Sequence, residues 1–310
     1  MTYPSSLRPN VPDSLSDSSI CITGSTGYVG RHLTQALIDN DHRPILIGRP
    51  EALPPSMAEA EGLGPWQDTR DLADRLAKLE NVVVINIAGY FLKKHDTSDI
   101  DALVSGNLQF PLQIFEALAE SGNNRIVNVG TTWEYDDSGN PEPANLYAVL
   151  KAANSSALQY YGRSRGLRGY NIKLNDTYGG LDARSKLMPM LKLAAQDNQA
   201  IKLHAADQLI NLLFITDVIE GLLSAAADTA SMAPGTIEQA SLLAAETITL
   251  EQLAEHIVQT IAVDMKIEFT HKSAEASGLR GVWNNAPRLP NWQPSIDLMT
   301  GLAHYFWEMG

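Results

Sequence analysis

Tyr147 and Lys151 stand four residues apart in a segment whose pattern predicts a helix beginning near Leu146. Side chains with this spacing project from the same face of a helix. A tyrosine ionises only at a pKa of about 10, but a cation within about 4–6 Å favours its phenolate by about 1–3 units. Lys151 would supply that charge and would also bond the ribose of a nicotinamide cofactor. Tyr147 could then pass a proton to or from a carbonyl or an alcohol while hydride moves the other way.

A glycine-rich loop near the start of the chain has the right form to hold such a cofactor. The apolar run from Ile20 to Ile22 leads into three glycines with the spacing G-x-x-G-x-x-G, and apolar residues then recur with helical period. The glycines permit a sharp turn and the close approach of a pyrophosphate, and a helix N-terminus supplies free N–H groups and partial positive charge. The residues predicted to bind the dinucleotide are Gly24, Ser25, Thr26, Gly27, Tyr28, Val29 and Gly30.

Neither motif is specific by itself, because both spacings arise by chance. The glycine loop, however, lies between a predicted strand and a predicted helix, and the Tyr147 helix follows a later predicted strand. This is the context that a dinucleotide loop requires. The two motifs together, in this order of strands and helices, therefore predict a dinucleotide site with a catalytic tyrosine.

Two further strand ends would contribute to the same site. The apolar strand Val82–Ile87 ends in Ala88 and Gly89, small residues that would let a cofactor lie across the strand tip. The strand from Arg125 to Val129 leads to Thr131 and Thr132, either of which could hydrogen-bond the substrate oxygen.

The end of the second predicted strand indicates which dinucleotide is bound. An acidic residue there would select NAD, whereas an arginine accommodates the extra phosphate of NADP. The run Pro44–Ile47 is followed by Arg49 and by no acid, and Arg31 could assist. We therefore expect NADP(H), with NAD(H) as the alternative, because a guanidinium matches a phosphate bidentately. Asp68 could reach the adenine.

Predicted strands alternate with predicted helices up to Asn171–Leu174, which indicates an α/β fold with a doubly wound parallel sheet (Rossmann). We expect residues 1–18 to form a flexible tail and residues 19–174 the dinucleotide-binding domain. Residues 175–310 would form mainly a smaller C-terminal substrate lobe, with 209–228 returning to the Rossmann domain. Within this lobe the segment from Ala200 to Phe214 resembles a hairpin.

Composition excludes several other classes of protein. The 310 residues carry a formal net charge of −13, which would repel nucleic acid. A single cysteine, Cys21, excludes an internal disulfide framework and is expected to be a small buried hydrophobe. The seven histidines show no metal-ligand spacing, so no metal is predicted. There is no membrane-span-length apolar run and no secretory signal, so we expect a cytoplasmic protein without a membrane partner.

Together these motifs resemble the extended short-chain dehydrogenase/reductase family, whose members act mostly on nucleotide-linked sugars. The resemblance covers nearly the whole chain after residue 18, and it includes Asp217-Val218 and the terminal Leu289-Pro-Asn-Trp-Gln-Pro. It implies that Thr131, Tyr147 and Lys151 form the catalytic trio and that Asn107 belongs to the cofactor site. It also implies a homodimer, because family members commonly pair the Asn107 and Tyr147 helices.

A narrower resemblance points to the CDP-abequose and CDP-paratose synthase group, which are NADPH-dependent reductases of a CDP-linked 4-keto-3,6-dideoxy sugar. It rests on Asn145-Leu-Tyr-Ala-x-x-Lys, Ile172-Lys-Leu-x-Asp-Thr-Tyr-Gly179, Asp182-x-Arg-x-Lys-Leu and Gln208-x-x-Asn. It implies that Arg184 and Lys186 lie near the substrate diphosphate. Thr132, Trp133 and Asp176 complete the expected substrate site, although the carboxylate of Asp176 is unsuited to contact phosphates.

The leading hypothesis is an NADPH-dependent 4-ketoreductase of a nucleotide-linked deoxysugar. Family dehydratases carry an Asp-Glu pair after the catalytic threonine, and here Thr132-Trp133 stands instead, which disfavours dehydration. The alternative is an NAD-dependent 4-epimerase that retains its oxidised cofactor through the cycle. A dinucleotide-sensing protein without catalysis is a third reading on the same fold.

Overall fold

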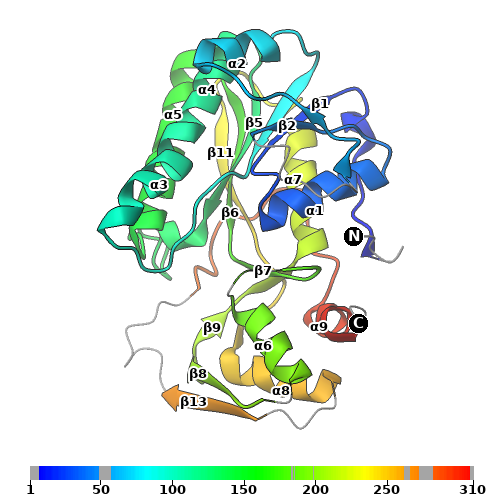
Figure 1. The fold of residues 1–310 in the computed structure, drawn as a ribbon, viewed down its shortest axis with the longest axis vertical. Coiled ribbons are helices and arrows are strands. Elements are labelled where there is room, and N and C mark those ends of the chain that lie inside the picture. Colours follow the sequence, from blue (N-terminus) through cyan, green and yellow to red (C-terminus); the bar gives the residue numbers. More distant parts are fainter. Residues whose placement is uncertain are drawn as a thin grey trace.

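The computed structural model describes residues 7–48, 57–182, 184, 186–197, 199–261, 266–271 and 282–307. A seven-stranded parallel sheet runs through its larger part, in the order β11-β6-β5-β4-β1-β2-β3 (Figure 1). The expected doubly wound α/β fold is therefore confirmed. The strands are β1 (Ser19–Thr23), β2 (Ile45–Ile47), β3 (Glu61–Gly62), β4 (Val82–Asn86), β5 (Arg125–Thr131), β6 (Arg168–Leu174) and β11 (Ile237–Leu242).

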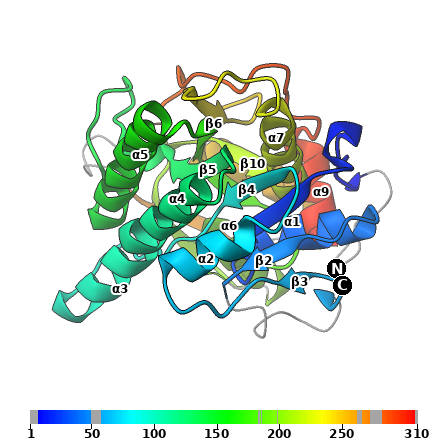
Figure 2. The same cartoon turned by 90° about the horizontal axis from the view of Figure 1, so that it is seen from above.

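Helices cover both faces of this sheet, which explains why its central strands are apolar on both sides. On β1, Ile20 and Ile22 pack into one core and Cys21 into the other. Burial raises the pKa of the Cys21 thiol to about 12, as expected for an inert buried cysteine. Figure 2 shows the two helical layers from above. One layer contains α2 (Thr69–Leu76), α3 (Ile100–Val104), α4 (Phe110–Glu120) and α5 (Leu146–Arg165), and the other contains α1 (Tyr28–Asp39) and α7 (Ile215–Asp228).

The strand order reverses between β1 and β4, so the chain leaves these neighbouring strands towards opposite faces of the sheet. Ligands of open parallel sheets bind at the carboxyl ends of the strands at such a point. The residues that follow β1 and β4 are the glycine loop and Ala88-Gly89. The topology thus brings together two segments that lie about 60 residues apart in the chain.

A smaller lobe lies beyond the carboxyl edge of the sheet, below it in Figure 1. Its helices are α6 (Leu187–Gln196), α8 (Leu250–Ile261) and α9 (Leu298–Trp307). Its short strands are β7 (Asp176–Tyr178), β8 (Ile201–Ala205), β9 (Leu209–Ile210), β10 (Leu212–Phe214), β12 (Ile248–Thr249) and β13 (Ile267–His271).

The hairpin expected over residues 200–214 is wrong. Strand β8 pairs with β13, β9 with β12 and β10 with β7, so each of the three strands finds a distant partner. Local alternation in β8 predicts a strand but carries no information about which strand lies beside it.

The N-terminal segment also differs from expectation. Instead of forming a flexible tail, its described part packs against the main domain, with Leu7, Val11 and Leu15 buried in the core that α1 and α7 share. The backbone N–H of Asn10 donates to Glu220 of α7 at 2.9 Å. The apolar residues in this Ser- and Pro-rich stretch are few, but each of these three is buried.

Candidate active site

The glycine loop has a shape that only glycine permits at two of its positions. Gly24 has a φ of +70°, and a Cβ atom there would lie 2.8 Å from the backbone nitrogen of Ala88. A Cβ atom on Gly30 would lie 2.1 Å from the carbonyl oxygen of Gly24. Helix α1 begins directly after Gly27 without a side-chain cap, so its first turn can receive an anion. These features fit the pyrophosphate of a dinucleotide.

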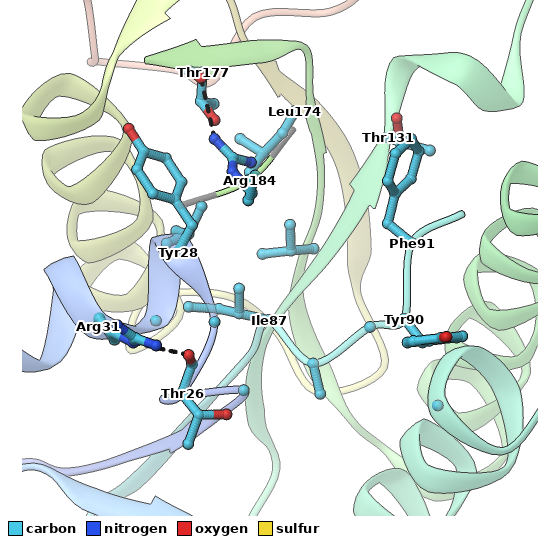
Figure 3. A pocket seen from close by; sticks show the side chains of 18 of the residues that line it. Thr26, Tyr28, Arg31, Ile87, Tyr90, Phe91, Thr131, Leu174, Thr177 and Arg184 are labelled. Carbon is cyan, nitrogen blue, oxygen red and sulfur yellow. Dashed lines mark hydrogen bonds between the residues drawn. The ribbon is translucent and has the colours of Figure 1, made fainter. Parts of the chain in front are cut away.

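A cavity of about 1000 Å³ opens over this loop and continues to the smaller lobe (Figure 3). Most of the residues predicted for the site line it. They are the seven residues Gly24 to Gly30, together with Ala88, Gly89, Thr131, Trp133, Tyr147, Lys151, Asp176, Arg184 and Lys186. The sequence thus anticipates the glycine loop and the Tyr147 helix in the cavity wall, but not other lining residues such as Trp66 and Phe110.

Helix α5 presents Tyr147 and Lys151 to the cavity. Asn145 caps the helix by accepting the N–H of Ala148 at 2.9 Å, which fixes where the first turn begins. The Lys151 ammonium is buried and donates to the carbonyl oxygens of Ala88 and Val129, both at 3.0 Å. Lys151 is therefore held between the ends of β4 and β5 while it faces the site.

The spacing of this pair predicts that Lys151 lowers the pKa of Tyr147, but in the structure burial dominates both groups. Burial lowers the pKa of Lys151 to about 8, and Glu134 opposes that shift while Lys173 adds to it. The pKa of Tyr147 is raised above its ordinary value, first by burial and then by the nearby charge of Glu134. Tyr147 is accordingly a neutral phenol near neutral pH, ready to give a proton rather than to take one.

Thr131 ends β5 and lines the same cavity as Tyr147. Its hydroxyl oxygen accepts the N–H of Trp133 at 3.2 Å, which leaves its own hydrogen available to donate towards a ligand. Thr131 also begins a short 3-10 turn in which Glu134 accepts the Thr131 N–H, a reciprocal capping box. Sequence reasoning missed Glu134, although the Thr-x-x-Glu spacing signals this arrangement.

A row of buried polar side chains crosses the sheet beneath the strand ends. Thr23, Asn86, Asn128 and Asn171 occupy matching positions on β1, β4, β5 and β6. The first three each donate to the next in the row, at 2.6, 2.7 and 3.0 Å. The hydroxyl of Thr23 in turn accepts the N–H of Ala88 at 3.1 Å. The row therefore fixes Ala88, whose carbonyl oxygen accepts a hydrogen bond from Lys151.

Aromatic rings and cations form the end of the cavity near the lobe. Phe91, which sequence reasoning also missed, contacts the rings of Tyr147 and Trp133 at centroid distances of 5.1 and 5.7 Å. The Lys186 ammonium lies 3.7 Å from the Phe91 ring centroid. Within the described part of the chain, the Lys186 side chain has no hydrogen-bond or ion-pair partner.

Arg184, in contrast, is already paired. Its guanidinium makes two hydrogen bonds of 2.7 Å to Asp182 and lies 3.8 Å from the ring centroid of Tyr28. Asp176 lies close by, and burial raises the pKa of its carboxyl against the influence of Lys186, Arg184 and Lys93. The cations around Asp176 reduce the repulsion that it would exert on an anionic ligand.

Three of the predicted residues that the structure describes do not line the cavity. Thr132 turns towards the carbonyl oxygen of Leu174, and Asp68 caps α2 by accepting the N–H of Asp71. Asn107 is buried and bonds both backbone groups of Tyr90, so it supports the segment after β4 without lining the cavity. Arg49 lies outside the described residues. Where Asp68 is expected near the adenine, Pro65 and Trp66 line the cavity instead.

Among the described residues, no group of three or more His, Cys, Asp or Glu side chains is arranged to hold a metal ion. No helix in the described part of the chain is long and apolar enough to cross a membrane.

A parallel sheet with a glycine loop and a Tyr-x-x-x-Lys helix at its switch point defines a dinucleotide-dependent enzyme of the short-chain dehydrogenase/reductase type. The model of the NAD dependent epimerase/dehydratase family matches residues 20–238, and the chain belongs to this family. CDP-abequose synthase from Yersinia pseudotuberculosis is 30% identical over 205 residues, covering 66% of this chain and 71% of that protein. The resemblance expected from the motifs is confirmed.

Solved structures agree on the fold. The UDP-N-acetylglucosamine 4-epimerase from Bacillus cereus superposes with a TM-score of 0.75 at 17% identity, covering 94% of this chain and 99% of that one. The UDP-glucose 4-epimerase from Thermus thermophilus, in complex with NAD, has a TM-score of 0.72 at 17% identity, covering 93% of this chain and 97% of that one.

Proposed function

We propose that the protein reduces the 4-keto group of a nucleotide-linked deoxysugar with a nicotinamide dinucleotide, NADPH in preference to NADH. The observation that carries this proposal is the convergence of Thr131, Tyr147 and Lys151 on one cavity that begins at the glycine loop. When bound, the reduced dinucleotide supplies hydride to the carbonyl carbon. The chain itself must then bind the sugar, orient its oxygen and deliver a proton.

Tyr147 is the proton donor in this scheme. Its raised pKa keeps the phenol protonated near neutral pH, which suits reduction of a ketone and opposes the opposite role of base. Lys151 has a pKa of about 8, so it is mostly a cation at neutral pH. It faces the site from the same helix and stabilises the phenolate that Tyr147 leaves behind. The Thr131 hydroxyl donates to the same carbonyl oxygen and orients it.

The far end of the cavity suits a deoxygenated sugar on a diphosphate. Phe91 and Trp133 present apolar ring surface beside Tyr147, where ring carbons without hydroxyl groups can pack without losing hydrogen bonds to water. The Lys186 ammonium makes no hydrogen bond or ion pair with the described residues, although the charge of Asp176 acts on it, and it would bind the diphosphate with Arg184. The similarity to a CDP-abequose synthase supports the same substrate class.

The choice of cofactor rests on the residues around the adenosine end. A neighbouring structure contains NAD, whereas the absence of an acid directly after β2 and the presence of Arg49 and Arg31 favour NADP. Arg31 lines the cavity, where its Nε donates to the carbonyl oxygen of Thr26 at 2.9 Å. NADPH therefore remains our proposal.

We also propose a homodimer formed through the outer face of α3 and α5. Val104, Val149 and Tyr160 expose large apolar side chains on these helices, with 37, 46 and 55% of their surface accessible. Covering them would remove apolar surface from water. Light scattering should give twice the mass of one chain.

The decisive test is nicotinamide absorbance with NADPH, and then with NADH, against a panel of nucleotide-linked 4-keto-6-deoxy sugars. Oxidation of the dinucleotide, faster with NADPH, is expected for a ketoreductase. Sugar isomerisation without net oxidation, together with NAD retained by the isolated protein, would instead establish the epimerase.

A further inference from the structure

Glu134 and Lys173 form an ion pair beneath the proposed catalytic residues. Both side chains are almost completely buried, at 1 and 0% exposed, and the Lys173 ammonium lies 2.5 Å from the Glu134 carboxylate. Lys173 belongs to β6, whereas Glu134 lies in the turn after Thr131. Neither residue lines the cavity, so neither is placed to touch a ligand there.

The pair is connected to both halves of the catalytic arrangement. One oxygen of Glu134 accepts the N–H of Thr131 at 2.9 Å. The other accepts the hydroxyl of Ser155 at 2.9 Å, and Ser155 also receives a hydrogen bond of 2.8 Å from Lys173. Because Ser155 lies one turn after Lys151 on α5, Glu134 ties the end of β5 to the helix that carries Tyr147 and Lys151.

Strand β5 leaves room for these two charged side chains at Gly130. A Cβ atom on Gly130 would lie 2.5 Å from Glu134 Oε1 and 2.9 Å from Lys173 Nζ. A buried ion pair adds little net stability compared with apolar residues of similar volume, because both ions must be removed from water. Stability alone therefore does not account for the placement of two charges against the catalytic residues.

We propose that Glu134 and Lys173 are positioning residues that hold Thr131 against the Lys151 turn of α5. The Glu134 carboxylate also favours the charged form of Lys151, whereas Lys173 opposes it. This role rests on the proposed function. The charged groups that act on the Lys151 ammonium are Glu134 from the turn and Lys173 from β6. Glu134 is the stronger of the two and favours the charged form, so the pair as a whole offsets part of the effect of burial.

The test is the pH dependence of reduced-dinucleotide binding, followed by the fluorescence of the bound nicotinamide, which needs no sugar substrate. The wild-type affinity should fall as the pH rises through about 8, where Lys151 loses its proton and its charge-assisted bond to the ribose. In Glu134→Gln the fall should begin about one pH unit lower. In turnover, kcat should fall while the KM for the sugar changes little.

Controls separate this role from a structural one. Glu238→Gln removes the same charge from an exposed position on β11. It should leave unchanged the midpoint, which is the pH at which the fall in dinucleotide affinity is half complete. If Glu134→Gln fails to fold because Lys173 is left uncompensated, Glu134→Gln/Lys173→Gln removes both charges. It should still shift the midpoint downwards, by less than the single variant, because Glu134 outweighs Lys173.

A folded Glu134→Gln or double variant with the wild-type midpoint would overturn the proposal. Absence of any pH dependence in the wild type would overturn it together with the role given to Lys151. A clear midpoint shift without reduction of any 4-keto sugar would support the positioning role while removing the proposed reaction. The two proposals can thus fail separately.

Discussion

The two ends of the cavity are built in different ways. Where the pyrophosphate is expected, the wall consists mostly of backbone and small residues, namely the glycine loop and the tip of β4, whose shapes follow from local rules. At the lobe end the wall consists of large side chains, among them Phe91, Trp133 and Lys186, that come from separate segments. We propose that the first end holds the dinucleotide and the second the nucleotide sugar.

This difference predicts how each end responds to substitution. A backbone cradle fails when one atom is added, because its neighbours are main-chain atoms that cannot rotate away. A side-chain wall loses affinity in steps, because each contact contributes separately. The substitutions below test this contrast, beginning with the largest expected effect.

Gly30→Ala should abolish dinucleotide binding. The added Cβ atom would lie 2.1 Å from the carbonyl oxygen of Gly24, so the loop cannot keep its shape. Gly27→Ala is the matched control, since its Cβ atom would lie 3.2 Å from the same oxygen and requires only a small shift. Fluorescence titration measures binding, and circular dichroism verifies the fold. Wild-type affinity in a folded Gly30→Ala protein would contradict the backbone-cradle account.

Tyr147→Phe should lower kcat by about 10²–10⁴-fold, the usual contribution of a general acid, while dinucleotide affinity stays nearly unchanged. Phenylalanine keeps the ring that packs against Phe91 and loses only the hydroxyl group. Tyr160→Phe, on the exposed side of the same helix, should leave turnover intact. Undiminished turnover in Tyr147→Phe would remove the assignment.

How far the sequence predicts this site follows the same division. The glycine loop, β4 and the start of α5 are encoded locally, by glycine spacing, apolar runs and the Asn145 cap, so they are predicted correctly. Phe91 reaches the cavity wall, and Lys173 pairs with Glu134 beneath it, through tertiary packing that no local pattern reports.

Asp68 shows the reverse error, because its position in the chain suggests a ligand of the adenine although it serves as a helix cap. Glu134 lies between these cases, since its capping box is visible in the sequence whereas its ion pair with Lys173, 39 residues later, is not.

Lys186→Met should raise the KM for the nucleotide sugar by about 10–100-fold, the value of a charge-assisted hydrogen bond of about 1.5–3 kcal/mol. The kcat should change little, because the diphosphate is bound equally in the ground state and the transition state. Lys202→Met, which removes an exposed lysine paired with Glu268 on the lobe, is the control. An unchanged KM in Lys186→Met would mean that the phosphates bind elsewhere.

The smallest expected effect concerns the choice between NADPH and NADH, where the dinucleotide end depends on side chains rather than backbone. Arg31 is exposed, so its charge is screened and should contribute only about 0.2–1 kcal/mol. Arg31→Gln should therefore weaken NADPH binding by about 1.4–5-fold and leave NADH binding unchanged, and Arg49→Gln should weaken NADPH binding more. If neither change alters the ratio of the two affinities, the absence of an acid after β2 does not indicate NADPH. The adenosine pocket, bordered by Pro65 and Trp66, would then select the dinucleotide by shape alone.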